Sequence, residues 1–302
     1  MTMSPTLKRR RDEVEPAPED WCTIENEPAV FHEIAQNIGA DMTTVNEVFD
    51  LTSINQNALG LIFTVKLEEE EDEDEDEEDH SKTTEQNPAS ASADVFFISQ
   101  IVNNVCATLA LLSILFNIDT RFDIGDHLKD FKQNNLGATP EERGVALGKD
   151  ILIRDTHNSF ASAQTRAQAR AEERERNTKK KRGRAKKARD VDIEDEVVYH
   201  YISYVSVGGH VWEMNGLEKG PRDLGPHPTD DWLSVVRPYL MEKMGDCLES
   251  TLMEVVPRNR DDVFENQRVD EWLLDNTRRK NDYTTFFQTL IRHLHGAKEI
   301  QL

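Results

Sequence analysis

The longest run of apolar residues extends from Val105 to Ile118 and contains neither Gly nor Pro. A bilayer span needs about 20 apolar residues, so this shorter run predicts a buried core helix. Asn103 and Asn104 precede the run and can accept hydrogen bonds from its first free N–H groups. The pattern places Cys106 in the first turn, where those N–H groups and the helix dipole favour a thiolate.

Weaker helical patterns lie on both sides of this run. Phe31, Ile34, Ala35 and Ile38 share one face of a helix expected between Trp21 and Ile38, which Gly39 would end. We expect further helices over Ile124–Phe131, over Thr139–His157 with Thr139 as its cap, from about Asp230 after a Thr229 cap, and from Arg260 onward.

Alternating or β-branched segments predict four strands, over Gly60–Leu67, Val197–Val207, His210–Met214 and Thr251–Val256. Gly208-Gly209 joins two of them by a turn of the kind that hairpins prefer. The expected fold class is α/β, with a central, mostly antiparallel sheet flanked by helices. The Cys106 helix would pass through the middle of this arrangement.

Charge is segregated along the 302 residues, whose net charge is −22. Asp and Glu fill Glu68–Asp79, whereas Lys and Arg dominate Arg166–Arg189. We interpret Glu68–Ala93 as a disordered insertion, and attraction to a basic partner is the alternative reading. Lys8–Arg11 is either a nuclear import signal or a solvated charge cluster.

The three cysteines, Cys22, Cys106 and Cys247, have no framework spacing, which favours a reducing compartment. With no signal-peptide pattern and no membrane span, we expect a soluble intracellular protein. No Cys/His spacing forms a metal ligand set and no glycine-rich phosphate loop occurs, so no cofactor is expected. The remaining histidines singled out, His157, His210 and His227, are interpreted as structural or surface residues.

Gln100 lies six residues before Cys106, which is itself preceded by N-N-V and followed by A-T. This Q-x5-C arrangement resembles the ubiquitin C-terminal hydrolase family, papain-like thiol hydrolases that release groups from the C-terminus of ubiquitin. The resemblance implies that Cys106 is the nucleophile. It also implies that the Gln100 side chain and the Cys106 backbone amide form the oxyanion hole.

A second matching segment, H-Y-I-S-Y-V, begins at His200, which the resemblance assigns as general base and acid. The family's orienting Asp lies in E-L-D-G-L, and the corresponding residues here are E-M-N-G-L, with Asn215 at that position. An amide oxygen can accept the imidazole N–H, as in papain-type Cys-His-Asn sites, but it supplies no negative charge. We therefore expect Asn215 to orient His200, within a thiolate–imidazolium pair that is already charge-separated at rest.

The resemblance covers most of Trp21 to Arg258 and is nearest to the long-chain branch associated with proteasomes and chromatin. It implies a catalytic domain at 21–258, a helical C-terminal extension at 259–302 and a long basic crossover loop at 163–196, which would pass above the active site. Composition and charge add a flexible basic tail at 1–20 and the acidic insertion at 68–93.

The sequence leaves two functions open. The first is a deubiquitinating cysteine hydrolase that cleaves after the C-terminal glycine of ubiquitin. The second is a catalytically impaired ubiquitin-binding scaffold, because Asn215 replaces the family's Asp. The expected partners are ubiquitin, its conjugates and a proteasome or chromatin adaptor at the C-terminal helices. No membrane is expected as a partner, nor sequence-specific nucleic acid, because the basic run has no interleaved aromatic residues. Its charge and that of the N-terminal cluster predict a nuclear and cytoplasmic location.

Overall fold

A six-stranded sheet in the order β1-β6-β2-β3-β4-β5 lies at the centre of the molecule, and each neighbouring pair is antiparallel. The computed structural model describes residues 20–66, 95–182, 199–228, 231–246, 250–281 and 283–299. The predicted α/β class is confirmed. The strands are β1 Thr43–Val48, β2 Gly60–Lys66, β3 Tyr199–Val207, β4 His210–Met214, β5 Arg222–Pro226 and β6 Thr251–Pro257.

The sequence pattern predicts β2, β3, β4 and β6 but neither edge strand. β1 has a mixed composition and pairs only with β6. β5 contains Gly225 at positive φ, and its pairing with β4 shifts register between Val211 and Trp212. An edge strand is held by the hydrogen bonds of one neighbour, so its own sequence carries a weak signal. The predicted turn at Gly208-Gly209 is present, with φ of 61° and 82°.

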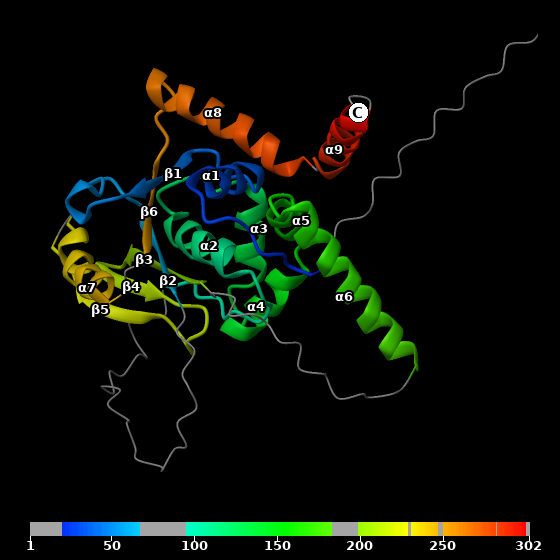
Figure 1. Ribbon diagram of the computed structural model, residues 1–302. Coiled ribbons are helices and arrows are strands. Elements are labelled where there is room, and N and C mark those ends of the chain that lie inside the picture. The colour runs from blue at the N-terminus through cyan, green and yellow to red at the C-terminus, as the bar shows by residue number, and fades with distance from the viewer. Residues whose placement is uncertain are drawn as a thin grey trace, which may run out of the picture.

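Helix α2 (Cys106–Ile118) begins one residue after the start of the predicted run and contacts the two central strands, β2 and β3. All its residues from Ala107 to Ile118 are buried, as an all-round apolar run predicts. Successive residues of β2 point to opposite faces of the sheet, so that Leu61 and Ile62 belong to two separate core clusters. α2 lies in the first cluster, and α7 (Leu233–Asp246) covers the second. Figure 1 shows α2 between the strands and helices α3 to α6.

Two helix predictions need correction. α1 spans only Pro28–Asn37, because the segment from Trp21 to Glu27 is not helical and Pro28 is suited to a first helical position. The helix expected over Thr139–His157 is two helices, since Asp150 leaves the helical conformation and its side chain caps the second one. Between α2 and the crossover segment lie α3 (Asp126–Asn134), α4 (Pro140–Lys149) and α5 (Ile151–Asn158). One 3-10 turn, η1 (Leu51–Ser53), lies between β1 and β2.

The predicted crossover loop is helical over its first part. Residues Ala163–Arg182 form α6, and residues 183–198 lie outside the described ranges. The segment is rich in Ala, Arg and Glu and has no Gly or Pro, a composition with high helix propensity. The basic tail at 1–19, the acidic insertion at 68–93, the Thr229 cap and Cys247 also lie outside the described ranges.

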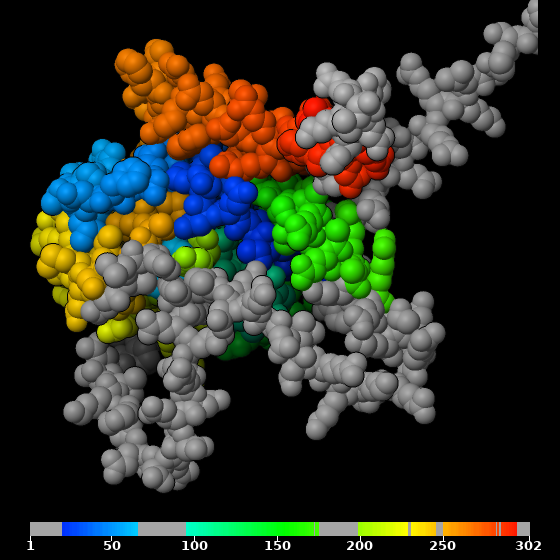
Figure 2. All heavy atoms as spheres, in the orientation of Figure 1, coloured from blue at the N-terminus to red at the C-terminus, as the bar shows by residue number. Residues whose placement is uncertain are grey.

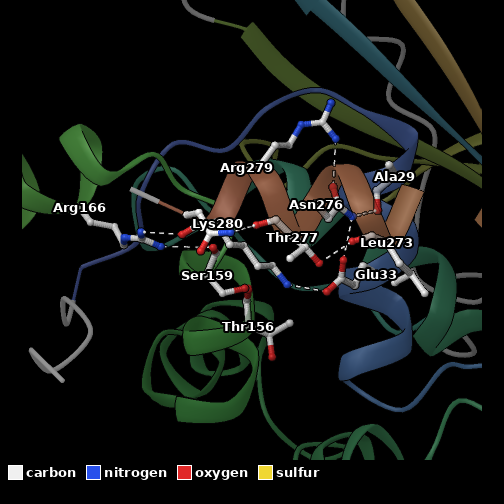
Figure 3. Close-up of polar contacts among 11 residues, drawn as sticks. Ala29, Glu33, Thr156, Ser159, Arg166, Leu273, Asn276, Thr277, Arg279 and Lys280 are labelled. Atoms are coloured by element: carbon white, nitrogen blue, oxygen red, sulfur yellow. Dashed lines mark hydrogen bonds and ion pairs between the residues drawn. The ribbon is translucent and has the colours of Figure 1, made fainter. Parts of the chain in front are cut away.

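The C-terminal extension forms helices α8 (Val263–Lys280) and α9 (Thr284–Glu299), and α8 lies across α1 in Figures 1 and 2. The buried Asn276 donates from Nδ2 to the carbonyl oxygen of Ala29 at 2.7 Å and to Glu33 at 2.8 Å (Figure 3). The extension therefore packs on α1 through α8. Within the described ranges, no helix is long and apolar enough to cross a membrane.

Candidate active site

Cys106 is the first residue of α2, as predicted, and Val105 occupies the N-cap position. The prediction that Asn103 and Asn104 cap this helix is wrong, because no side chain caps it. Asn104 instead donates from Nδ2 to the carbonyl oxygen of Trp21 at 3.0 Å. The first-turn N–H groups therefore remain available to the Cys106 sulfur and to a substrate oxygen.

The thiol of Cys106 is subject to two opposing effects. Burial raises the pKa of Cys106, and this effect is larger than the lowering by backbone N–H groups of Ala107, Cys106 and Tyr201, which hydrogen-bond to the sulfur. The neutral thiol is therefore favoured in the free chain. The helix start does lower the pKa, as the sequence predicts, but burial prevails.

Gln100 ends an extended segment, residues 95–100, that is clamped on two sides. Asn117 of α2 exchanges two hydrogen bonds with the backbone of Phe96, at 2.9 and 3.0 Å. Arg143 of α4 donates from Nη1 to the carbonyl oxygen of Phe97 at 3.0 Å. The Gln100 side chain is half-buried, and its Oε1 has no hydrogen-bond partner among the described residues. The backbone that carries Gln100 is thus held in place, and Oε1 of its side chain makes no hydrogen bond to the described residues.

His200 lies near the start of β3, with its Nε2 2.7 Å from Oδ1 of Asn215. The backbone N–H of Leu217 donates to the same Oδ1 at 3.1 Å, which identifies this atom as the acceptor. Nε2 of His200 therefore carries the hydrogen, and Nδ1 has the free lone pair. Burial lowers the pKa of His200 more than the bond to Asn215 raises it. Burial thus opposes both charges of the thiolate–imidazolium pair expected from the sequence.

Gly216 joins these parts of the site by a close approach. The Gln100 N–H donates to the carbonyl oxygen of Gly216 at 2.8 Å. A Cβ added at Gly216 would lie 2.6 Å from Cδ2 of Leu109, on α2, and 3.2 Å from Cβ of Gln100. A Cβ here would therefore require the Leu109 side chain to turn away or Gln100 to shift. The glycine next to Asn215 thus lets the loop after β4 pack closely against α2 and Gln100.

The three other histidines singled out in the sequence, His157, His210 and His227, have structural partners. His157 is fully buried, with Nε2 2.7 Å from the Cys22 carbonyl oxygen, whereas Nδ1 of His210 lies 2.9 Å from Asp223. Nε2 of His227 lies 2.7 Å from Oγ of Ser206. Across the described residues, no group of three or more His, Cys, Asp or Glu side chains is placed to hold a metal ion.

Sequence reasoning missed two features of the site. The glycine of M-N-G-L is visible in the sequence, but only the fold shows that it touches α2. The pair of asparagines before Cys106 is also visible, but helix capping is a local rule and does not predict a bond to Trp21, which lies 83 positions away along the chain.

A thiol at an uncapped helix start, with backbone N–H groups at its sulfur and an oriented imidazole one residue before Tyr201, suits acyl transfer in the manner of papain-like thiol hydrolases. A model of the family "Ubiquitin carboxyl-terminal hydrolase, family 1" matches residues 21–245. The chain therefore belongs to this family and is a thiol-dependent deubiquitinating hydrolase. The resemblance noted in the sequence is confirmed.

Individual relatives support the same conclusion. The chain is 32% identical over 272 residues to the ubiquitin carboxyl-terminal hydrolase isozyme L5 of Dictyostelium discoideum, covering 87% of this chain and 68% of that protein. It is 28% identical to ubh-4 of Caenorhabditis elegans, covering 93% and 89%. The UCH37 catalytic domain of Trichinella spiralis, bound to ubiquitin vinyl methyl ester, has a TM-score of 0.59 and 26% identity, covering 80% and 98%. These similarities favour a hydrolase over a silent scaffold.

Proposed function

We propose that the chain cleaves the bond after the C-terminal glycine of ubiquitin, with Cys106 as nucleophile and His200 as its base. The observation that carries the proposal is the bond between His200 and Asn215. It fixes the imidazole of the residue that precedes Tyr201, whose backbone N–H hydrogen-bonds to the Cys106 sulfur. The similar UCH37 catalytic domain was crystallised with ubiquitin vinyl methyl ester, which supports ubiquitin as the substrate.

The proposed reaction starts from two neutral groups. Because Asn215 holds the Nε2 hydrogen, Nδ1 of His200 takes the thiol proton as the sulfur attacks the carbonyl carbon. The Gln100 side-chain amide and the Cys106 backbone N–H receive the oxyanion. His200 gives the proton to the leaving group, which departs and leaves a thioester on Cys106. Water, deprotonated by the same nitrogen, then hydrolyses the thioester and restores the thiol.

Covalent capture tests this assignment. Ubiquitin vinyl methyl ester should form a single adduct on Cys106, detected by peptide mass spectrometry. Cys106→Ala should lose both this adduct and the hydrolysis of a ubiquitin C-terminal fluorogenic amide, with ubiquitin affinity nearly unchanged. Cys247→Ala is the control and should retain both activities. Full turnover by Cys106→Ala would reject the assignment, whereas ubiquitin binding by the wild-type chain without adduct or turnover would support the silent scaffold.

The Gln100 amide is tested separately. Gln100→Ala should lower kcat by roughly 10²–10³, as loss of one oxyanion donor does in other hydrolases, with little effect on KM. Equal kcat in the variant would remove Gln100 from the oxyanion site.

We also infer that α9 receives a protein adaptor, of the proteasome or chromatin type that the resemblance implies. Its large apolar side chains are exposed, among them Phe286 at 60% and Leu294 at 58%. Replacing Phe287 and Ile291 by Asp should abolish co-migration with purified proteasomes and leave turnover of the fluorogenic amide intact. Gln288→Asp, on the same helix, is the matched control. The basic clusters, including 178–189, support a nuclear as well as cytoplasmic location.

A further inference from the structure

Asn104 has an unusual backbone conformation for a residue so close to the nucleophile. Its φ is 61°, and it is the one non-glycine residue at positive φ in the described part of the chain. Asparagine tolerates this left-handed region better than most residues, but it still needs the surroundings to hold it there. The bond from Nδ2 of Asn104 to the Trp21 carbonyl oxygen, at 3.0 Å, provides that support.

The segment that accepts this bond, Asp20–Cys22, is itself held by side chains of α5. Asn158 donates from Nδ2 to the Asp20 carbonyl oxygen at 2.7 Å and accepts from the Cys22 N–H at 2.9 Å. His157 Nε2 lies 2.7 Å from the Cys22 carbonyl oxygen, and its ring meets that of Trp21 edge-on at 5.0 Å. The acceptor for Asn104 is therefore a fixed part of the fold and not a free end.

His157 also binds the nucleophile helix. Because its Nε2 must donate to a carbonyl oxygen, its Nδ1 accepts from the hydroxyl of Thr108, at 2.7 Å. Asn104 and Thr108 stand two positions before and two positions after Cys106. The backbone on both sides of the nucleophile is thus tied to the same short segment.

We infer that Asn104 is a positioning residue, which acts through the Trp21 carbonyl to aim the Cys106 backbone N–H at the developing oxyanion. The inference rests on the proposed function, in which that N–H is one of the oxyanion donors. Asn104 touches neither the sulfur nor the substrate carbonyl in this scheme. It holds the left-handed turn that sets the direction of the first amide of α2.

The inference separates two reactions of the same sulfur. Thioester formation from a ubiquitin amide develops an oxyanion and needs the Cys106 N–H in place. Alkylation by iodoacetamide is a displacement at a saturated carbon and develops no oxyanion. A loss of thiol reactivity or of fold affects both reactions, whereas a misdirected amide affects only the first.

The experiment compares Asn104→Gly, Asn104→Ala and the control Asn103→Gly, an exposed neighbour without a hydrogen bond among the described residues. Glycine keeps the left-handed backbone accessible and removes only the side-chain bond. Alanine removes the bond and also disfavours the turn. Site-resolved mass spectrometry follows alkylation at Cys106, and ubiquitin affinity is measured in the Cys106→Ala background.

We expect kcat on the ubiquitin fluorogenic amide to fall roughly tenfold in Asn104→Gly and further in Asn104→Ala, within the 10²–10³ of a whole donor. KM, ubiquitin affinity and the alkylation rate should stay within about threefold, and Asn103→Gly should match the wild type. Thr108→Val removes the hydrogen bond between α2 and His157 and should show the same pattern more weakly.

Wild-type kcat in Asn104→Gly, or a parallel fall in the alkylation rate, would overturn the inference. Capture of the wild-type chain by ubiquitin vinyl methyl ester is established first. A failure of the proposed function would appear there, before any variant is compared.

Discussion

Asn215 places an amide oxygen where the family pattern has a carboxylate, and either group can accept an imidazole N–H. They differ in charge, because a carboxylate stabilises the imidazolium that forms when His200 takes the thiol proton. In the structure burial lowers the pKa of His200, and no negative charge at position 215 opposes that effect.

Asn215→Asp should therefore raise the pKa of His200 and move the acid limb of the kcat/KM profile to higher pH. The sign follows because the protonated ring cannot act as the base, and a higher pKa keeps it protonated to a higher pH. We expect kcat/KM at its optimum to improve by about tenfold or less. Asn215→Ala should cost more than this gain, because it leaves the ring unheld.

Steady-state kinetics with the fluorogenic amide between pH 5 and 9 measure this prediction. Recovery by several orders of magnitude in Asn215→Asp, from an inert starting chain, would instead identify position 215 as an off-switch.

Gly216 gives a second prediction at the scale of one residue. A Cβ in Gly216→Ala would lie 2.6 Å from Cδ2 of Leu109 and 3.2 Å from Cβ of Gln100, so the Leu109 side chain must turn away or Gln100 must shift. Overpacking of this kind costs about 1–3 kcal/mol of unfolding free energy. Because a shift at Gln100 would displace its side-chain amide from the proposed oxyanion site, kcat should fall more than stability alone explains.

Urea denaturation and turnover together check this expectation. Gly220→Ala is the matched control, because a Cβ there would meet no atom within 4 Å. Equal turnover in the two variants would show that the close approach at Gly216 does not set the site.

The motif residues could be predicted from the sequence, but their electrostatic state could not. Cys106, His200, Gln100 and Asn215 follow from local patterns and a family resemblance. The pKa directions follow from burial, which depends on how α2 packs on the sheet. At Cys106 burial raises the pKa and the helix start lowers it, and the larger effect of burial cannot be read from the local sequence.

At the scale of elements, the contact between α1 and α8 contains a buried histidine. His32 is 1% exposed, neither ring nitrogen has a hydrogen-bond partner among the described residues, and its ring lies 5.6 Å from that of Trp272 on α8. Burial, with Arg258 and Arg268 nearby, lowers the pKa of His32 to about 4. The docked helix therefore requires the neutral ring.

This pKa predicts loss of stability in acid. Since the unfolded chain binds a proton near pH 6.5 and the folded chain only near pH 4, stability falls as the pH drops through that window. Between pH 7 and pH 5 the contribution of His32 should fall by about 2 kcal/mol.

His32→Phe removes the titrating group and should reduce the pH dependence of the unfolding free energy by that amount. Urea denaturation at the two pH values provides the measurement. Burial also lowers the pKa of His157 to about 4. The pH dependence of stability that His157 contributes is present in both the wild type and His32→Phe, so it serves as an internal reference. An unchanged difference between the two pH values would show that His32 does not titrate as the structure indicates.

Most elements could be predicted because their pattern reflects their own burial, as for α2 and β2. The exceptions depend on neighbours. β1 and β5 are edge strands held by one partner each, and Asp150 divides one helical pattern into α4 and α5 by capping the second. α6 has the composition of a helix, but its charge also fits an extended insertion, and the pattern alone does not separate the two.

At the scale of the whole molecule, the first turn of α6, in the crossover segment, meets the end of α8, in the C-terminal extension. Arg166, in the first turn of α6, donates to the carbonyl oxygens of Ser159 at 3.3 Å and of Lys280 at 3.5 Å (Figure 3). The ammonium group of Lys280 lies over the ring of Phe160 at 4.1 Å. Thr178 follows Arg166 by about 18 Å of helix, so the basic run begins well beyond this anchor.

The most basic part of this segment, Thr178–Arg189, should therefore act on the location of the protein or on its choice of partner, and not on the chemical step. Deleting Thr178–Arg189 leaves the anchor at Arg166 in place, so turnover of a small ubiquitin adduct should stay within a few-fold of wild type. Nuclear accumulation, or binding to acidic surfaces, should fall because the deletion removes most of a dense positive cluster. A variant with each Lys and Arg of the run replaced by Gln keeps its length and separates charge from chain connectivity. Fluorescence localisation and kinetics measure the two effects, and a collapse of small-adduct turnover in either variant would mean that the run orders the active site.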